Sequence, residues 1–130
     1  MRVFGWTLAW AFLGMLAIQP AKAGNFANSG EIVVVTHIDI IPNSAGVAPP
    51  AAVQLLEQFV LDSRKDPDVK YFTLITWDPT TNHFQLLEVY RDMHSFNAHV
   101  SASHTIEFRD NIQQYIGAPY DERVYQSAKW

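Results

Sequence analysis

Hydrophobic positions recur with two different periods along the chain. Residues 31–41 read Glu-Ile-Val-Val-Val-Thr-His-Ile-Asp-Ile-Ile, and this β-branched run predicts a strand. In residues 51–65 the apolar side chains follow the i, i+3, i+4, i+7 spacing of a helix with one buried face. Residues 69–77 and 84–91 alternate on either side of a turn rich in Asp, Pro, Thr and Asn, which predicts an antiparallel hairpin.

A second helix is expected to begin at Met93, because the carboxylate of Asp92 can accept from the free N–H groups of a helix start. We expect this helix to bend or break at residues 101–103 and to end near Gly117. Residues 119–128 predict a last strand. The order strand, helix, strand, strand, helix, strand is the ferredoxin-like one, an α+β fold with a four-stranded antiparallel sheet and helices on one face. The apolar open face predicts a homodimer.

An apolar segment precedes this domain. Arg2 gives it a short basic start, residues 3–18 form the apolar run, Pro20 breaks that run, and Ala21-Lys22-Ala23 has the small-residue pattern of a cleavage site. Residues 1–23 are therefore predicted to be a signal peptide, which implies an exported protein, periplasmic or secreted. An uncleaved membrane anchor is the alternative, but its apolar run is shorter than the roughly 20 residues that a spanning helix needs. Residues 24–30 are expected to form a flexible arm before a domain of residues 31–130.

Charge and cysteine content exclude several classes of function. Without the predicted leader the chain would lose two basic residues, Arg2 and Lys22, and would carry 7 basic against 13 acidic side chains. Such an acidic chain is a poor nucleic-acid binder and has no reason to stay on a membrane after leader cleavage. The chain has no cysteine, which excludes disulfides, thiolate metal sites and a cysteine nucleophile.

Motifs in the second half resemble a known family. The residues that carry the resemblance are Phe84-x-Leu-x-Glu88-x-Tyr90-x-Asp92, Phe96-x-x-His99, Ser103-His104 and Phe108. In this order they resemble the antibiotic biosynthesis monooxygenase superfamily, which includes small quinol monooxygenases. Residues 63–67 and 117–125 also fit its pattern, although Asp68 stands where many members have Gly. The resemblance implies a dimeric α+β barrel. Some members oxidise quinols or phenols with O₂ and no cofactor, and others degrade haem.

His99 is the first candidate for chemistry. It follows Phe96 on the predicted helix, on the side expected to face the sheet. An imidazole titrates near neutral pH and could take a phenolic proton from a bound quinol. The resulting phenolate gives an electron to O₂ more readily than the phenol, so no cofactor is needed. The alternative is a structural histidine that bonds Glu88 or a backbone carbonyl.

Glu88 is the second candidate. A carboxylate in the middle of an apolar strand is costly to bury unless it is paired. It could orient His99 or accept a hydroxyl of the substrate. The alternative is a structural ion pair with a basic residue, of which three are within plausible reach: Arg91, Arg109 and Arg123.

His104 follows His99 by five residues, which places it off the His99 face of a straight helix. It reaches the same pocket only if the helix breaks at residues 101–103; otherwise it has a surface or helix-start role. No metal site is expected, because the histidines in this half are not at the i, i+4 spacing of a helical zinc pair. These are His83, His94, His99 and His104.

Several aromatic residues could line the pocket or stack on a flat substrate. They are Tyr71, Trp77, Tyr90, Phe96 and Phe108. For the residues on strands, ordinary sheet packing or a dimer interface is the alternative. His37 and Asp39 share one strand face and could be a base with its orienting carboxylate, although such neighbours are also common on a solvated edge.

Haem cleavage is a rival activity within the same family. Haem-degrading members have a Trp on the second helix and a His ligand further along it. Here His99 stands in place of the Trp, and Phe108-Arg109-Asp110 occupies the ligand region, which disfavours haem cleavage. The sequence therefore predicts a cofactor-independent monooxygenase that acts on a small quinol or phenolic aromatic with O₂. The alternatives are a non-catalytic dimeric module for a small aromatic ligand and a haem-degrading relative.

Overall fold

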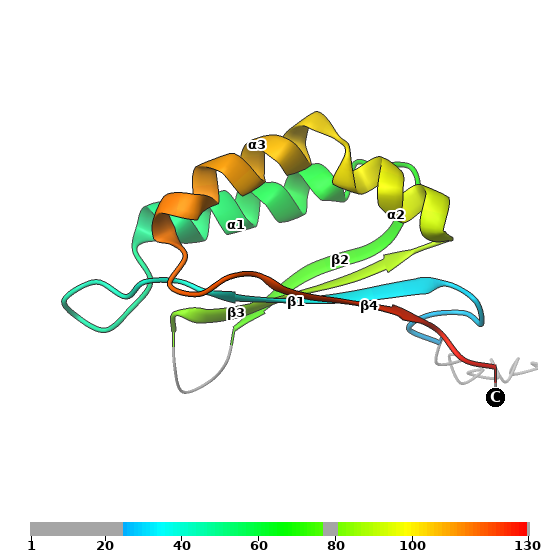
Figure 1. Cartoon of the computed structure of the whole chain (residues 1–130), viewed down its shortest axis with the longest axis horizontal. Helices are drawn as coiled ribbons and strands as arrows, with labels where there is room; N and C mark the ends of the chain where they lie inside the picture. Colours follow the sequence, from blue (N-terminus) through cyan, green and yellow to red (C-terminus); the bar gives the residue numbers. More distant parts are fainter. Residues whose placement is uncertain (1–24, 77–80, 130) are drawn as a thin grey trace, which may run out of the picture.

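Four strands form one antiparallel sheet. They are β1 (Ile32–Asp39), β2 (Val69–Thr76), β3 (His83–Tyr90) and β4 (Asp121–Gln126), in the order β2-β3-β1-β4. The computed structural model describes residues 25–76 and 81–129 (Figure 1). Trp77 and the predicted signal peptide lie outside the described residues. Element order and strand order confirm the ferredoxin-like prediction.

Three helices cover one face of this sheet (Figure 1). They are α1 (Pro50–Ser63), α2 (Met93–Val100) and α3 (Ser103–Ile112), and α3 continues into a short 3₁₀ helix, Gln113–Tyr115. Pro50 occupies the first turn of α1, where its missing N–H removes no intrahelical bond. Asp92 caps α2, since its Oδ1 accepts from the backbone N–H of Ser95 at 2.8 Å. This confirms the predicted start of the second helix.

The expected interruption of the second helix lies at Ser101 and Ala102. The backbone N–H and the hydroxyl of Ser101 both donate to the carbonyl of Asn97, at 3.1 and 2.9 Å. Ala102 is extended, and its carbonyl accepts from Thr105 and Ile106 at the start of α3. The chain therefore ends one helix and starts another within two residues, and α3 runs in a new phase.

The main core fills the space between the sheet and helices α1 and α3. Its largest contacts are aromatic: the rings of Phe59 and Phe108 stack in parallel with centroids 4.0 Å apart, and Phe72 meets Phe59 edge-on at 5.3 Å. Such pairs add to the stabilisation from burial alone. They also form the wall behind which the candidate site lies.

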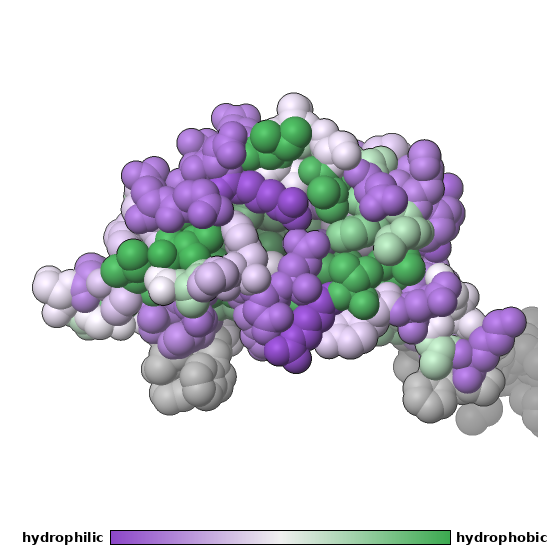
Figure 2. All heavy atoms as spheres, viewed as in Figure 1, coloured by the Kyte–Doolittle hydropathy of each residue, from purple (hydrophilic) through white to green (hydrophobic). Residues whose placement is uncertain are grey.

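No helix of the described residues lies over the opposite face of the sheet. On this face Tyr71 and Ile75 are each 44% exposed, and Phe26 lies edge-on against Tyr71 at 5.0 Å. This contact holds part of the predicted N-terminal arm against the sheet. Seen from the β4 edge, the hydrophobic residues are interrupted by hydrophilic ones (Figure 2). Among the described helices, none has the length and apolar character to cross a bilayer.

Candidate active site

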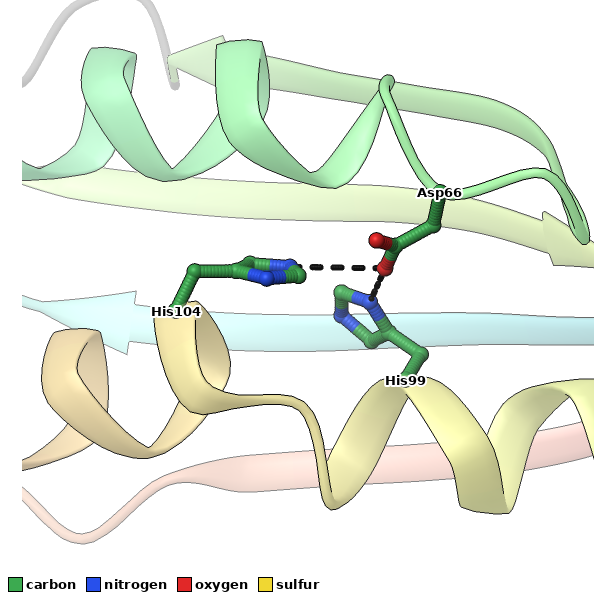
Figure 3. A group of neighbouring side chains, drawn as sticks. All are labelled: Asp66, His99 and His104. Atoms are coloured by element: carbon green, nitrogen blue, oxygen red, sulfur yellow. Dashed lines mark hydrogen bonds and ion pairs between the residues drawn. The ribbon is translucent and has the colours of Figure 1, made fainter.

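A buried histidine and a carboxylate from a distant loop form the centre of the site. His99, on α2, is 5% exposed, and its Nδ1 lies 2.8 Å from Oδ2 of Asp66. Asp66 follows α1 and is held by a hydrogen bond from its N–H to the carbonyl of Ser63. Figure 3 shows both side chains pointing toward each other from α2 and from the loop after α1. Because an ionised carboxylate only accepts, Nδ1 of His99 carries the hydrogen.

Aromatic rings surround the imidazole of His99. Those of Phe72 and Tyr90 have their centroids 5.4 Å from it, and that of Phe59 lies 5.7 Å away. Burial lowers the pKa of His99, and the hydrogen bond to Asp66 opposes this shift only in part. The ring is therefore neutral at neutral pH, with a lone pair on Nε2. This arrangement can accept a proton.

His99 lines a small cavity, and its Nε2 lies 3.4 Å from the hydroxyl oxygen of Thr105, which lines the same cavity. The cavity has a volume of about 20 Å³, which is room for about one water molecule. Its walls are formed by Thr36, Phe59, Leu86, Glu88, Phe96, His99, Val100, Thr105, Phe108, Arg109, Tyr120 and Glu122. The predicted pocket residues Phe96 and Phe108 thus line the cavity.

Glu88 shares this cavity but makes no ion pair within the described residues. It is 5% exposed, and its Oε2 accepts from the hydroxyl of Tyr90 at 2.6 Å. Thr36 donates to the other oxygen at 3.5 Å. Burial raises the pKa of Glu88 to about 7, so the carboxyl is poised between its two protonation states at neutral pH.

The structure corrects the predicted ion pairs of Glu88. Each of the three arginines pairs with a carboxylate nearer the surface: Arg91 with Asp68, Arg109 with Glu122, and Arg123 with Asp121. A surface pair keeps the guanidinium in water, whereas reaching Glu88 would require its burial. Glu88 also makes no direct bond to His99. It shares the cavity, and Tyr90 links it to the aromatic wall.

The helix break brings His104 to the site. Its Nε2 lies 3.4 Å from the same Asp66 oxygen that His99 contacts, and the two imidazole centroids are 5.4 Å apart. The predicted condition, a break at residues 101–103, is therefore met. The break also removes the spacing argument against a metal site, because Asp66, His99 and His104 offer three ligand atoms within 4.8 Å of one another.

Two predicted pocket residues lie on the wrong side of the sheet. Tyr71 and His37 have their side chains on the open face, away from His99, because strand residues alternate between faces. The proposed pairing of His37 with Asp39 is also wrong. Nδ1 of His37 contacts the amide of Gln85 at 3.1 Å, and Asp39 pairs with His83 across the β1–β3 ladder.

A second hollow lies between α1 and α3. It has a volume of about 110 Å³, and both Phe59 and Phe108 contribute to its walls, as they do to the walls of the small cavity. His104 also lines it. The stacked phenyl rings thus form part of the walls of both spaces, and the second space is large enough for a small organic group.

Solved structures share this architecture. One described as an antibiotic biosynthesis monooxygenase aligns with a TM-score of 0.68 at 15% identity, over 75% of this chain and 99% of that one. The chain has the fold of the antibiotic biosynthesis monooxygenases. Rv0793 from Mycobacterium tuberculosis aligns with a TM-score of 0.66 at 16% identity, over 77% of this chain and 97% of that one. No protein-family model and no curated protein matches the sequence.

A structure of SnoaB, described as a cofactor-independent oxygenase from Streptomyces nogalater, also has the antibiotic biosynthesis monooxygenase fold. It aligns with a TM-score of 0.64 at 10% identity, over 78% of this chain and 97% of that one. At such identities the comparison extends to the fold and not to individual side chains. The site must therefore be argued from the residues of this chain.

Within the antibiotic biosynthesis monooxygenase fold of this chain, two residues of the site escaped the sequence analysis. Asp66 entered only as part of residues 63–67, which fit the family pattern, and Thr105 was assigned no role. Asp66 lies 33 residues from His99 in the sequence, and no local pattern links the two. One signal could have found Asp66. The ferredoxin-like topology places the loop after the first helix at the α2 end of the sheet, so an acidic residue in that loop is a possible partner of a histidine on α2.

Proposed function

We propose that this protein is a cofactor-independent monooxygenase that oxidises a quinol or a related phenol with O₂, with His99 as the base. The observation that carries the proposal is the buried His99–Asp66 pair beside a cavity that His99 lines, with Nε2 of His99 within 3.4 Å of the Thr105 hydroxyl. A carboxylate that holds Nδ1–H fixes the tautomer in which Nε2 is basic. The shared fold with a protein described as a cofactor-independent oxygenase supports the same reading.

The proposed reaction requires only a general base and a pocket that excludes water. Nε2 of His99 takes a phenolic proton, and the phenolate gives an electron to O₂ to form a radical pair. Recombination joins oxygen to the ring, and loss of water completes the reaction. For hydroquinone the balance is one quinol and one O₂ to one hydroxyquinone and one water. Glu88, with a pKa of about 7, can take up or return a proton at the same cavity.

Substrate access requires movement of the aromatic wall. A cavity of about 20 Å³ does not hold an aromatic ring, whereas the hollow beyond Phe59 and Phe108 has about 110 Å³. Rotation of the Phe108 ring would join the two spaces beside His99. We therefore propose that the substrate ring enters between α1 and α3 and displaces Phe108 from its stack.

We also propose that the protein is a homodimer. Tyr71, Ile75 and Tyr125 are each between 44% and 49% exposed, and Tyr71 and Ile75 lie on the sheet face that none of the described helices covers. Apolar side chains in water favour association, and a second copy offers the same surface to them. A face-to-face dimer would leave the His99 site on the helical side of each copy.

The test is oxygen uptake by the purified chain with a panel of hydroquinones. We expect uptake above the spontaneous rate in the wild type and a loss of about 10²–10⁴-fold in His99→Gln, the usual worth of a general base. His94→Ala is the matched control, because His94 is an exposed histidine on the same helix. Oxygen uptake that persists in His99→Gln would show that His99 is not the base, although the protein would still be an oxygenase.

A non-catalytic module that holds a small aromatic ligand is the second candidate. The observation in its favour is the small size of the cavity that Phe96 and Phe108 line, which has room for about one water molecule. In that case ligand binding would occur in the hollow between α1 and α3 without reaching His99. Saturable binding of phenols without oxygen uptake by any quinol would select this function.

A further inference from the structure

We propose that Asp66, His99 and His104 form a binding site for one divalent transition-metal ion of the zinc type. This site goes beyond the proposed oxygenase, which uses no metal. Two imidazoles and one carboxylate are a ligand set that such ions take in proteins. Figure 3 shows the three side chains converging from α2, α3 and the loop after α1.

The distances suit a shared ion. Oδ2 of Asp66 lies 2.8 Å from Nδ1 of His99 and 3.4 Å from Nε2 of His104, and all three ligand atoms are within 4.8 Å of one another. Ligands bound at zinc–nitrogen and zinc–oxygen distances stand about 2.9–3.4 Å apart in octahedral or tetrahedral geometry. The two distances to Asp66 are close to that range, and the separation of the two histidine nitrogens, within 4.8 Å, would shorten as the His104 ring closes on the ion.

The nitrogen of His104 points independently to a ligand. Its Nε2 is buried, yet it makes no hydrogen bond to any residue of the described part of the chain. A buried polar atom without a hydrogen bond is uncommon in native proteins and needs a reason. The 3.4 Å approach to Asp66 is an electrostatic contact without hydrogen-bond geometry. A cation between the two side chains would satisfy both.

The surroundings provide support and access. If Nδ1 of His99 binds the ion, Nε2 carries the hydrogen and can donate to Thr105 Oγ1, 3.4 Å away, as the second nitrogen of a metal-bound histidine commonly does. The side chains of Asp66 and His104 are 26% and 22% exposed, so an ion can enter from solvent. Three protein ligands leave further coordination positions for water.

Metal binding and base function exclude each other in this arrangement. An ion on Nδ1 of His99 forces the hydrogen onto Nε2, which then has no lone pair for a substrate proton. Zinc should therefore inhibit any oxygen uptake that depends on His99. The two proposals still fail separately, because zinc affinity is measured without substrate and oxygen uptake is measured in chelator-treated protein.

The experiment is calorimetric titration of Zn²⁺ into the full chain, purified without a histidine tag and treated with chelator. We expect one ion per chain in the wild type. His104→Phe keeps an aromatic ring but removes the ligand, and Asp66→Asn keeps the shape but removes the charge. Each should weaken binding by at least about 10-fold. His94→Ala, which changes an exposed histidine outside the group, should bind as the wild type does.

Several outcomes would overturn the site. One is the absence of saturable one-to-one zinc binding by the wild type. The others are a zinc affinity in His104→Phe and Asp66→Asn equal to that of the wild type, and a loss of zinc affinity in His94→Ala. The absorption spectrum of the Co²⁺-loaded protein gives a readout that a fold defect does not mimic, since its visible bands report the coordination number. Circular dichroism of each variant shows that the comparison is made between folded chains.

Discussion

Asp66 Oδ2 accepts from His99 Nδ1 at 2.8 Å, although 33 positions separate the two residues in the sequence. The contact links the loop after α1 to α2 and fixes which nitrogen of the imidazole carries the hydrogen. A neutral, oriented imidazole in an aromatic shell is suited to proton transfer. The same oxygen also faces His104, so this carboxylate is common to both proposed activities.

Asp66→Asn should reduce oxygen uptake with little loss of fold. The amide keeps the size of the side chain, but it no longer stabilises the imidazolium that forms when His99 takes a proton. We expect kcat to fall by about 10²–10⁴-fold, the range of a general-base contribution. Asp62→Asn is the control, since Asp62 is a carboxylate near the end of α1 that pairs with Lys65 instead. Equal rates in the wild type and Asp66→Asn would contradict the orienting role.

Glu88→Gln should stabilise the protein at high pH and not at low pH. The folded chain holds the Glu88 proton up to a pKa of about 7, whereas an unfolded chain releases it near 4.5. The wild type therefore loses stability as pH rises through this window, by up to about 3 kcal/mol, and the neutral amide does not. Urea denaturation at about pH 4 and about pH 8, on either side of this window, measures the difference.

The control for this prediction is Glu107→Gln, which changes an exposed carboxylate on α3. Its effect on the free energy of unfolding should be small and nearly independent of pH. A Glu88→Gln variant whose stability follows that of the wild type at every pH would show that burial does not hold the proton on Glu88.

Phe108→Ala should open the wall beside His99. Phe108 is 6% exposed and stacks on Phe59, so its removal should lower the free energy of unfolding by about 3–5 kcal/mol. It should also join the two hollows and allow phenol to bind, which calorimetry or a ligand-dependent rise in Tm detects. Ile106→Ala is the control, because Ile106 is 51% exposed on the same helix. Phenol that stabilises both variants equally would place the entry route elsewhere.

Ile75→Glu should separate the proposed dimer. Ile75 lies on the open face of β2, and a carboxylate there would be buried without a partner if two sheets pack together. We expect sedimentation to report a dimer for the wild type and a monomer for the variant at the same concentration. Leu61→Glu, which changes an exposed residue of α1, should leave the dimer intact. A wild type that sediments as a monomer throughout would reject the interface.

Local pattern was enough to predict the elements of this fold. The strand alternation, the Asp92 cap and the break after Val100 depend on neighbours in sequence, and the structure has all three. Pattern also predicted which residues share a strand face, but not which face the helices cover. Tyr71 and His37 were therefore placed in the pocket although they lie on the open face.

The electrostatic partners could not be read from the sequence. Glu88 was expected to meet an arginine and meets Tyr90, because the cost of burying a guanidinium outweighs the attraction. The partners considered for His99 were Glu88 and a backbone carbonyl, but His99 meets Asp66. Such contacts depend on how a loop crosses the end of a sheet, which no spacing rule describes.

The two-residue break between α2 and α3 changes the direction in which the side chains of α3 point relative to those of α2. In one continuous helix His99 and His104 would point about 140° apart around the axis, and only one could face Asp66. The break allows both to meet the same oxygen. The site can therefore be taken apart without altering any of its three side chains: one residue inserted or deleted between the helices would turn His104 away and leave the His99–Asp66 pair standing alone.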